Sequence, residues 1–99
     1  SAASDVYKRQ SLNNIKGISC LSPEGAFYVF PNCKKLLNKK TKLKTDKDFV
    51  EKLLEKAEVA VVQGSAFGLD GYFRISYATS MENLKKAMQR IKTFCDSLN

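Results

Sequence analysis

The chain has 99 residues, which allows one small domain, and its 43% hydrophobic and 27% charged residues are typical of a folded globular protein rather than a disordered one. It contains no histidine, which excludes Ser-His and Cys-His nucleophile pairs within the chain and removes the commonest metal ligand, so no metal site is predicted. The net charge of +7 makes nucleic acid a partner to consider, whereas no apolar run approaches the roughly 20 residues that span a bilayer.

The first ten residues differ from the rest of the chain. Residues 5–10, Asp-Val-Tyr-Lys-Arg-Gln, resemble the translation of a transposon-end tag used to prepare sequencing libraries. Residues 1–10 are therefore predicted to be a non-native, tag-derived tail and are not used to predict the fold, and residues 11–99 are predicted to form the domain. A truncated reading frame follows from this interpretation, with more protein expected upstream.

The next segment predicts a helix end and two short strands. Residues 11–15 are expected to form the last turn of a helix, with Gly17 as its C-terminal stop. Residues 18–21 and 26–30 are rich enough in β-branched and aromatic side chains to predict strands, the second ending at Pro31. Residues 32–37 predict one helical turn.

Much of the positive charge is concentrated in one connection. Seven lysines fall within residues 34–47, without interleaved aromatic residues or arginines: Lys34, Lys35, Lys39, Lys40, Lys42, Lys44 and Lys47. This pattern favours a solvated surface loop over a nucleic-acid site. The three cysteines, Cys20, Cys33 and Cys95, fit neither a zinc motif nor a disulfide framework, which predicts reduced thiols in a cytoplasmic protein.

Two helices are predicted from capping signals and apolar periodicity. Thr45 followed by Asp48 forms a capping-box pattern before a helix at residues 46–56. Its apolar stripe consists of Phe49, Val50, Leu53, Leu54 and Ala57. Residues 59–62 predict a short strand. Thr79 and Glu82 repeat the capping pattern before the last helix, whose stripe is Met81, Leu84, Ala87, Met88, Ile91, Phe94, Cys95 and Leu98.

Between those helices, residues 63–80 hold three of the five glycines and a strand with a central arginine. Alternation along the predicted strand, residues 72–78, places Tyr72 and Arg74 on one face and Phe73 and Ile75 on the other. The chain has fourteen lysines and three arginines, so an arginine on an apolar strand suggests a need for a planar, two-pronged donor that grips a carboxylate or phosphate. An ion pair of Arg74 with Asp70 or Glu58 is the alternative.

The order of these elements predicts the fold class. Helix end, strand, helix, strand, strand and helix give an α+β fold, in which helices pack on one face of a small, mostly antiparallel sheet.

Three collinear motifs resemble one enzyme family. They are Ser-Pro-Glu-Gly-Ala-Phe-Tyr-Val-Phe-Pro at residues 22–31, Val-Ala-Val-Val at 59–62 followed by Gly64, and Gly-Ser-Ala-Phe-Gly with Phe-Arg-Ile-Ser-Tyr-Ala at 64–68 and 73–78. Together they are similar to the C-terminal small domain of class I, fold-type I aminotransferases, with the bacterial aspartate aminotransferases nearest. One departure is Gln63, where relatives commonly carry His or Pro.

The resemblance implies a function for the full-length protein, namely transfer of an amino group between an amino acid and a 2-oxo acid with pyridoxal 5'-phosphate. Arg74 would bind the substrate α-carboxylate and Phe67 would line the site, although core packing is an equal alternative for Phe67. No lysine here lies in a Ser-x-x-Lys motif, so the Schiff-base lysine and the cofactor site are expected upstream, and the fragment alone is expected to be inactive. A homodimer is also implied.

Two other functions remain open from the sequence. A small basic α+β nucleic-acid-binding module would use the lysines for phosphates and Phe27, Tyr28 and Tyr72 for stacking. The other is an amino-acid-binding regulatory domain without catalysis. The preferred amino acid, whether aspartate, prephenate-type or aromatic, does not follow from this segment.

Overall fold

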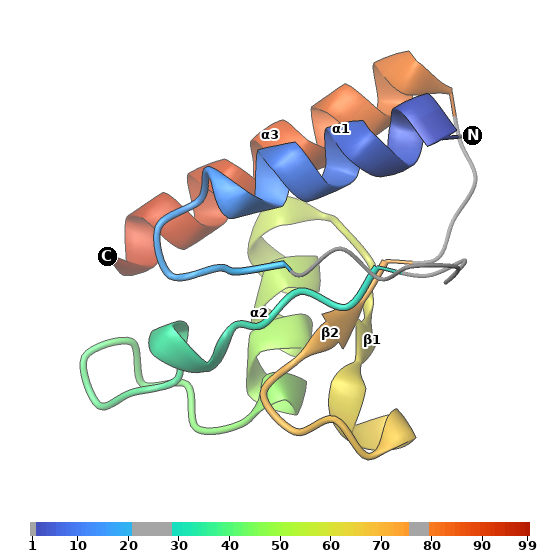
Figure 1. Cartoon of the computed structure of the whole chain (residues 1–99). Helices are drawn as coiled ribbons and strands as arrows, with labels where there is room; N and C mark the ends of the chain where they lie inside the picture. The colour runs from blue at the N-terminus through green and yellow to red at the C-terminus, as the bar shows by residue number, and fades with distance from the viewer. Residues whose placement is uncertain (1, 21–28, 76–79) are drawn as a thin grey trace.

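The computed structural model describes residues 2–20, 29–75 and 80–99 (Figure 1). Three α-helices, two 3-10 helices and two short strands make up the described chain. They are α1 (Ala2–Asn13), η1 (Lys34–Leu36), α2 (Asp46–Ala57), β1 (Val62–Gln63), η2 (Gly64–Phe67), β2 (Phe73–Arg74) and α3 (Met81–Leu98). None of the described helices is long and apolar enough to cross a membrane.

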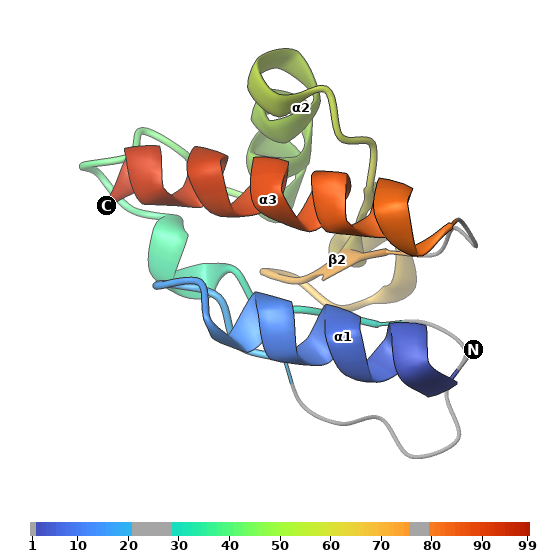
Figure 2. The ribbon, with the colours of Figure 1, turned by 90° about the horizontal axis from the view of Figure 1, so that it is seen from above.

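The helices are arranged around α3. Helices α1 and α3 lie side by side, and the two strands lie below them with α2 (Figure 1). Seen from above, α3 lies between α1 and α2 (Figure 2). Helix α2 contacts both α3 and β1, so α3 and the sheet share one core. The predicted α+β class with a small antiparallel sheet is confirmed.

The sheet is smaller than the sequence predicts. Strands β1 and β2 are antiparallel, with Val62 opposite Arg74 and Gln63 opposite Phe73. Single bridges then join residues 29–32 to β2, at Val29 with Ile75 and at Asn32 with Tyr72, and Ser19 to Asn32. The expected strand at 59–62 is reduced to its last residue, and the strand at 72–78 is described only to Ile75. The motif at 22–28 lies outside the described residues.

Helix α2 follows its predicted bounds because its signals are local. The Thr45 hydroxyl accepts a hydrogen bond from the Asp48 N–H at 3.2 Å, and the Asp48 carboxylate accepts one from the Thr45 N–H at 3.2 Å, which completes the predicted capping box. Phe49 and Leu53 are fully buried. Leu54 was wrongly placed in the stripe: it is 53% exposed, because it lies one residue, about 100°, beyond the buried Leu53.

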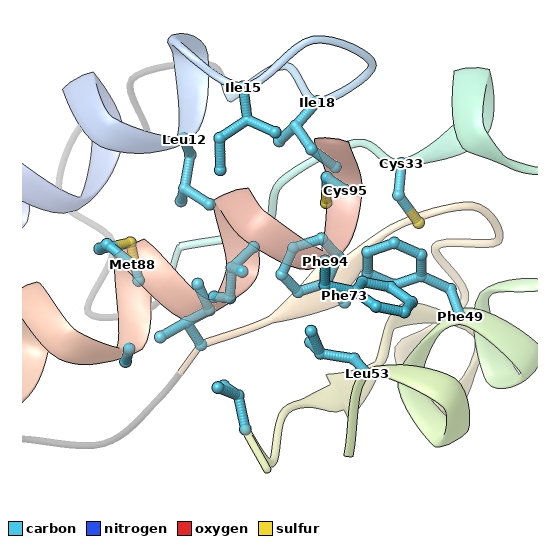
Figure 3. Close-up of a cluster of buried hydrophobic side chains, with 14 of the residues drawn as sticks. Leu12, Ile15, Ile18, Cys33, Phe49, Leu53, Phe73, Met88, Phe94 and Cys95 are labelled. Atoms are coloured by element: carbon cyan, nitrogen blue, oxygen red, sulfur yellow. The ribbon is translucent and has the colours of Figure 1, made fainter. Parts of the chain in front are cut away.

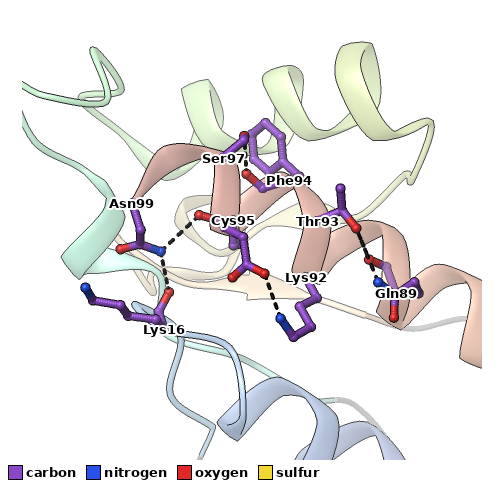
Figure 4. Close-up of polar contacts among 9 residues, drawn as sticks. Lys16, Gln89, Lys92, Thr93, Phe94, Cys95, Ser97 and Asn99 are labelled. Carbon is purple, nitrogen blue, oxygen red and sulfur yellow. Dashed lines mark hydrogen bonds and ion pairs between the residues drawn. The ribbon is translucent and has the colours of Figure 1, made fainter.

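Helix α3 begins one residue later than the predicted cap implies. Ser80, not Thr79, is the N-cap, and its hydroxyl accepts a hydrogen bond from the Asn83 N–H at 3.2 Å. Most of the predicted stripe is buried: Leu84, Ala87, Met88, Ile91, Phe94 and Cys95. Met81, the first helical residue, is 38% exposed. The far end of α3 is tied to the turn after α1, because the Asn99 side-chain amide donates to the carbonyls of Lys16 and Cys95, both at 3.0 Å (Figure 4).

Residues 2–10, which the sequence analysis did not use to predict the fold, are part of helix α1. Tyr7 packs against the core and Lys8 is buried, so this segment contributes to the packed structure. The helix ends at Asn13. The expected last turn at residues 11–15 closes with hydrogen bonds that the Asn14 and Ile15 N–H groups donate to preceding carbonyls. The suggested origin of residues 1–10 in a sequencing tag stays a prediction.

The core joins residues from every helix. The Phe49 ring contacts Phe73 at 5.2 Å and Phe94 at 5.6 Å between centroids, which links α2, β2 and α3 (Figure 3). Leu12, Ile15 and Ile18 add the end of α1 and its following turn. The three cysteines are thiols outside any disulfide, and all three are buried. Burial raises the pKa of both Cys33 and Cys95 to about 12.

The lysine-rich connection lies on the surface. All seven of its lysines are exposed, which confirms the expected solvated loop. The Thr41 hydroxyl organises this loop by donating to the Leu36 carbonyl at 2.7 Å.

Candidate functional site

Arg74 and Phe67, the two residues singled out by the sequence, lie against each other. The guanidinium carbon of Arg74 is 4.3 Å from the centroid of the Phe67 ring. Arg74 is half-buried, with its Nε atom covered, and Phe67 is 46% exposed. Phe67 therefore lies at the surface beside the guanidinium rather than in the core, which argues against the core-packing alternative.

Phe30 adds a second ring to this cluster. Its centroid is 6.0 Å from that of Phe67, and the two rings meet edge to face at 77°. Phe30 was predicted only as the end of a strand, and an aromatic residue at a strand end gives no signal of a partner 37 positions later. This is an arrangement that aromatic pairs prefer, so Phe30 helps to fix the orientation of the Phe67 ring.

The strand alternation that places Arg74 is confirmed. Phe73 and Ile75, its two neighbours, are 0% and 1% exposed and point into the core, so the Arg74 side chain leaves on the other face. Backbone pairing fixes the strand on both sides: Arg74 lies opposite Val62 of β1, and the Ile75 N–H donates to the Val29 carbonyl at 3.1 Å. The sheet thus fixes the backbone position from which the Arg74 side chain extends.

A compact turn carries Phe67 back towards β2. The Gly64 N–H donates to the Tyr72 carbonyl at 2.7 Å, and the Leu69 N–H donates to the Gly64 carbonyl at 2.9 Å. A Cβ atom at position 64 would lie 2.3 Å from the Leu69 carbonyl oxygen, so only glycine fits this close approach. Gly68 ends η2 with φ +79, in the left-handed region that favours glycine.

Asp46 holds the two ends of this turn and was missed by the sequence analysis, which assigned it only to the start of a helix. Its carboxylate accepts hydrogen bonds from the Ser65 N–H at 2.8 Å and from the Gly71 N–H at 3.3 Å. It is 3% exposed. Burial by itself raises the pKa of Asp46, but the hydrogen bonds from Ser65 and Gly71 outweigh it and hold that pKa below its ordinary value.

Other residues in and near this turn have structural contacts or lie exposed on its surface. Ser65 receives a hydrogen bond on its hydroxyl from the Gln63 amide at 3.3 Å, so the unusual Gln63 supports the start of the turn. Glu58 is the C-cap of α2, in the left-handed conformation with φ 56. Asp70 is exposed in the turn. The Tyr72 ring lies 5.0 Å from the Lys34 ammonium.

The side chains of this cluster have the chemistry that anion recognition requires. Arginine presents paired N–H donors in a plane that matches a carboxylate, and an aromatic face beside the guanidinium holds that plane in one orientation. In the described ranges, no group of histidine, cysteine or acidic residues could hold a metal ion. The cluster of Arg74, Phe67 and Phe30 therefore suits the binding and orientation of an anionic group.

Comparison with known proteins gives the chain a family. A model of the family described as Aminotransferase class I and II matches residues 3–91. The probable aspartate/prephenate aminotransferase of Rhizobium leguminosarum bv. phaseoli is 58% identical over 88 residues, which are 85% of this chain and 22% of that protein. The aspartate aminotransferase of Rhizobium meliloti strain 1021 is 55% identical over 92 residues, 89% of this chain and 22% of that protein.

Solved structures agree with the sequence relatives. The crystal structure of the aspartate aminotransferase from Rhizobium meliloti superposes with a TM-score of 0.90 at 50% identity, over 96% of this chain and 25% of that one. Alanine aminotransferase from Pyrococcus furiosus gives a TM-score of 0.86 at 37% identity, over 97% of this chain and 24% of that one. The chain spans about a quarter of the length of these relatives. It belongs to the class I and II aminotransferase family.

Proposed function

We propose that the full-length protein is a pyridoxal-phosphate-dependent aminotransferase, and that this chain is its C-terminal small domain, which binds the substrate α-carboxylate through Arg74. Family membership supports the activity. The observation that carries the role of this chain is the Arg74 guanidinium, fixed by the sheet and stacked on the exposed Phe67 ring at 4.3 Å. Family membership is also the ground for preferring this proposal to a stand-alone nucleic-acid-binding module.

Carboxylate binding by Arg74 orients the substrate. Two parallel N–H···O bonds fix both the position and the plane of the carboxylate, which a lysine ammonium cannot do. The substrate Cα then has a defined position relative to the reacting atoms, and a displacement of about 1 Å can cost on the order of a hundredfold in rate. The rigid pairing of β2 with β1 and Val29 supplies this precision.

The cofactor is assigned to the rest of the protein. Bound pyridoxal phosphate supplies an electron sink for the bond-breaking at the substrate Cα. The described cluster offers one guanidinium and two phenyl rings, which suit a carboxylate rather than an anchored cofactor. Its anchoring lysine and phosphate-binding groups are accordingly placed upstream of this segment.

The relatives indicate the substrate class. Three relatives at 53–58% identity carry the names aspartate aminotransferase or probable aspartate/prephenate aminotransferase. We therefore propose aspartate as an amino donor and a 2-oxo acid as the acceptor. A homodimer and a cytoplasmic location belong to the same proposal, and three buried thiols outside any disulfide fit a reducing compartment.

The test uses the full-length protein expressed from its complete reading frame. Arg74→Ala should raise the Michaelis constant for aspartate by about tenfold to a hundredfold, because it removes charge-assisted hydrogen bonds. Arg74→Lys should recover little of this loss, because the planar two-point contact is absent. Arg90→Ala, which removes an exposed arginine from α3, is the matched control and should leave the kinetics unchanged. Unchanged kinetics in Arg74→Ala would refute the role of Arg74.

A further inference from the structure

Asp46 has a position that helix capping does not explain. It is the first residue of α2, where an acidic side chain commonly satisfies free backbone N–H groups. Thr45 and Asp48 already complete the capping box of this helix. The Asp46 carboxylate also accepts hydrogen bonds from the N–H groups of Ser65 and Gly71, which lie 19 and 25 residues further along the chain.

The two oxygens of Asp46 join the two ends of one turn. Oδ2 accepts from Ser65, at the start of η2, and Oδ1 accepts from Gly71, just before the strand that carries Arg74. Phe67 lies between these anchor points, with its ring against the Arg74 guanidinium. One buried carboxylate thus fixes both the turn that presents Phe67 and the entry of the chain into β2.

The bonds are strong enough to position the turn. A carboxylate that accepts backbone N–H bonds makes charge-assisted hydrogen bonds, about twice as strong as neutral ones. Asp46 is 3% exposed, so water does not compete for its oxygens. The N-terminal end of α2 adds a favourable dipole for the same charge.

We propose that Asp46 is a positioning residue for substrate binding: its carboxylate holds the 65–71 turn so that Phe67 stays stacked on Arg74 and the guanidinium faces the substrate carboxylate. This rests on the proposed role of Arg74 as the carboxylate-binding group. Asp46 itself touches no substrate and acts through the turn.

Asp46→Asn in the full-length protein tests the proposal. Asparagine keeps the size but offers one oxygen to two N–H groups, so one charge-assisted bond is lost and an NH2 group faces a donor. The Michaelis constant for aspartate should rise about tenfold, the effect expected for one such bond, while kcat changes much less.

Asp48→Asn is the matched control. It removes the same charge from the same helical turn, but Asp48 uses a single oxygen for both of its bonds, to the Lys44 and Thr45 N–H groups, and asparagine can keep that oxygen in place. The Michaelis constant should stay within a factor of two of the parent. An equal rise in both variants would show a general helix or charge effect and overturn the proposal.

A double-mutant cycle separates this proposal from the proposed function. If Asp46 acts through Arg74, Asp46→Asn should have little further effect on the Michaelis constant in an Arg74→Ala background. Arg74→Ala without effect refutes the proposed function. Two results would refute the positioning role alone, given a large rise in the Michaelis constant in Arg74→Ala. In the first, the effects of Asp46→Asn and Arg74→Ala on the Michaelis constant are additive. In the second, Asp46→Asn changes the Michaelis constant no more than Asp48→Asn does.

Hydrogen exchange gives a readout independent of activity. Deuterium uptake in a peptide covering residues 64–72 should quicken about tenfold in Asp46→Asn and stay unchanged in Asp48→Asn, because only the first variant releases the turn. Unchanged uptake in Asp46→Asn would overturn the proposal. If Asp46→Asn fails to fold, Ser65→Ala removes the hydroxyl bond to Asp46 together with the bond from the Gln63 amide, and Gln63→Ala removes the second bond alone. Ser65→Ala should raise the Michaelis constant about twofold to fivefold and Gln63→Ala should not; no difference between the two variants counts against the proposal.

Discussion

At the scale of single residues, the site pairs a cation with an aromatic ring. The Phe67 ring centroid lies 4.3 Å from the Arg74 guanidinium carbon, and the Phe67 ring packs edge to face with Phe30. A ring beside a guanidinium leaves the in-plane N–H donors available, because the attraction acts through the flat face. Phe67 can therefore orient Arg74 without competing with an incoming carboxylate for its hydrogen bonds.

Phe67→Leu tests this orientation. Leucine keeps the apolar bulk and loses the aromatic face, so the Michaelis constant for aspartate should rise about twofold to fivefold, as expected for a partly exposed cation–π contact. The measurement is steady-state kinetics of the full-length protein. Leu69→Ala, at a 38% exposed position of the same turn, is the control and should have no effect. A Phe67→Leu protein with parental kinetics would show that the stacking is incidental.

The sequence pointed to Arg74 and Phe67 but not to Asp46. Arg74 is conspicuous as an arginine in a lysine-rich chain, and the motif at residues 64–68 singles out Phe67. Asp46 looks like any acidic residue in the first turn of a helix, and its role depends on partners 19 and 25 residues away. No local pattern encodes contacts at that separation.

At the scale of elements, helices α2 and α3 were predictable, whereas most of α1 and the bounds of the strands were not. Helix α2 was expected at residues 46–56 and is observed at Asp46–Ala57, because its cap and its apolar spacing are local. Strands β1 and β2 are two residues each, and their bounds are set by pairing with each other and with residues 29–32. Adjacent Thr79 and Ser80 both suit an N-cap, so the sequence alone placed the start of α3 one residue early.

The capping box of α2 should be measurable locally. Thr45→Ala removes the hydroxyl that accepts from the Asp48 N–H and should destabilise the helix by about 1 kcal/mol, which corresponds to roughly fivefold faster opening. Hydrogen exchange of peptides within Asp46–Ala57 in the full-length protein is the measurement. Thr93→Ala, at an exposed site inside α3, is the control and should not increase exchange, since alanine is the better helix former. Equal exchange in both variants would contradict the assigned cap.

At the scale of the whole molecule, the core depends on neutral thiols. Cys33 and Cys95 are fully buried among residues from α1, α2, α3 and the sheet. Burial raises the pKa of each to about 12 from an ordinary value of 9.0, and the nearby Asp46 charge adds to the rise at Cys33. The native state therefore keeps both protons at a pH at which the unfolded chain releases them.

Alkaline pH should consequently destabilise the fold. Below about pH 9 both thiols are protonated in the folded and the unfolded states, and their contribution to stability is fully present. Between about pH 9 and 12 only the unfolded chain ionises, so the free energy of unfolding falls as the pH rises and the contribution is lost by about pH 12. Denaturation midpoints of the full-length protein measured from pH 7 to 11 should decline, and Cys95→Ala should flatten the decline. A flat profile in the parent protein would contradict buried, neutral thiols.

The register of β2 links the position of Arg74 to the packing of the domain core. Phe73 lies in the interior and Arg74 on the opposite face, so sliding the strand by a single position would turn the phenyl ring out to water and drive a cation among hydrocarbon side chains. Under the proposed role of Arg74, few substitutions in this strand could change the substrate preference without also disrupting the core. Changes in preference among descendants of this fold should accumulate in the surrounding turns and leave the arginine's backbone where it is.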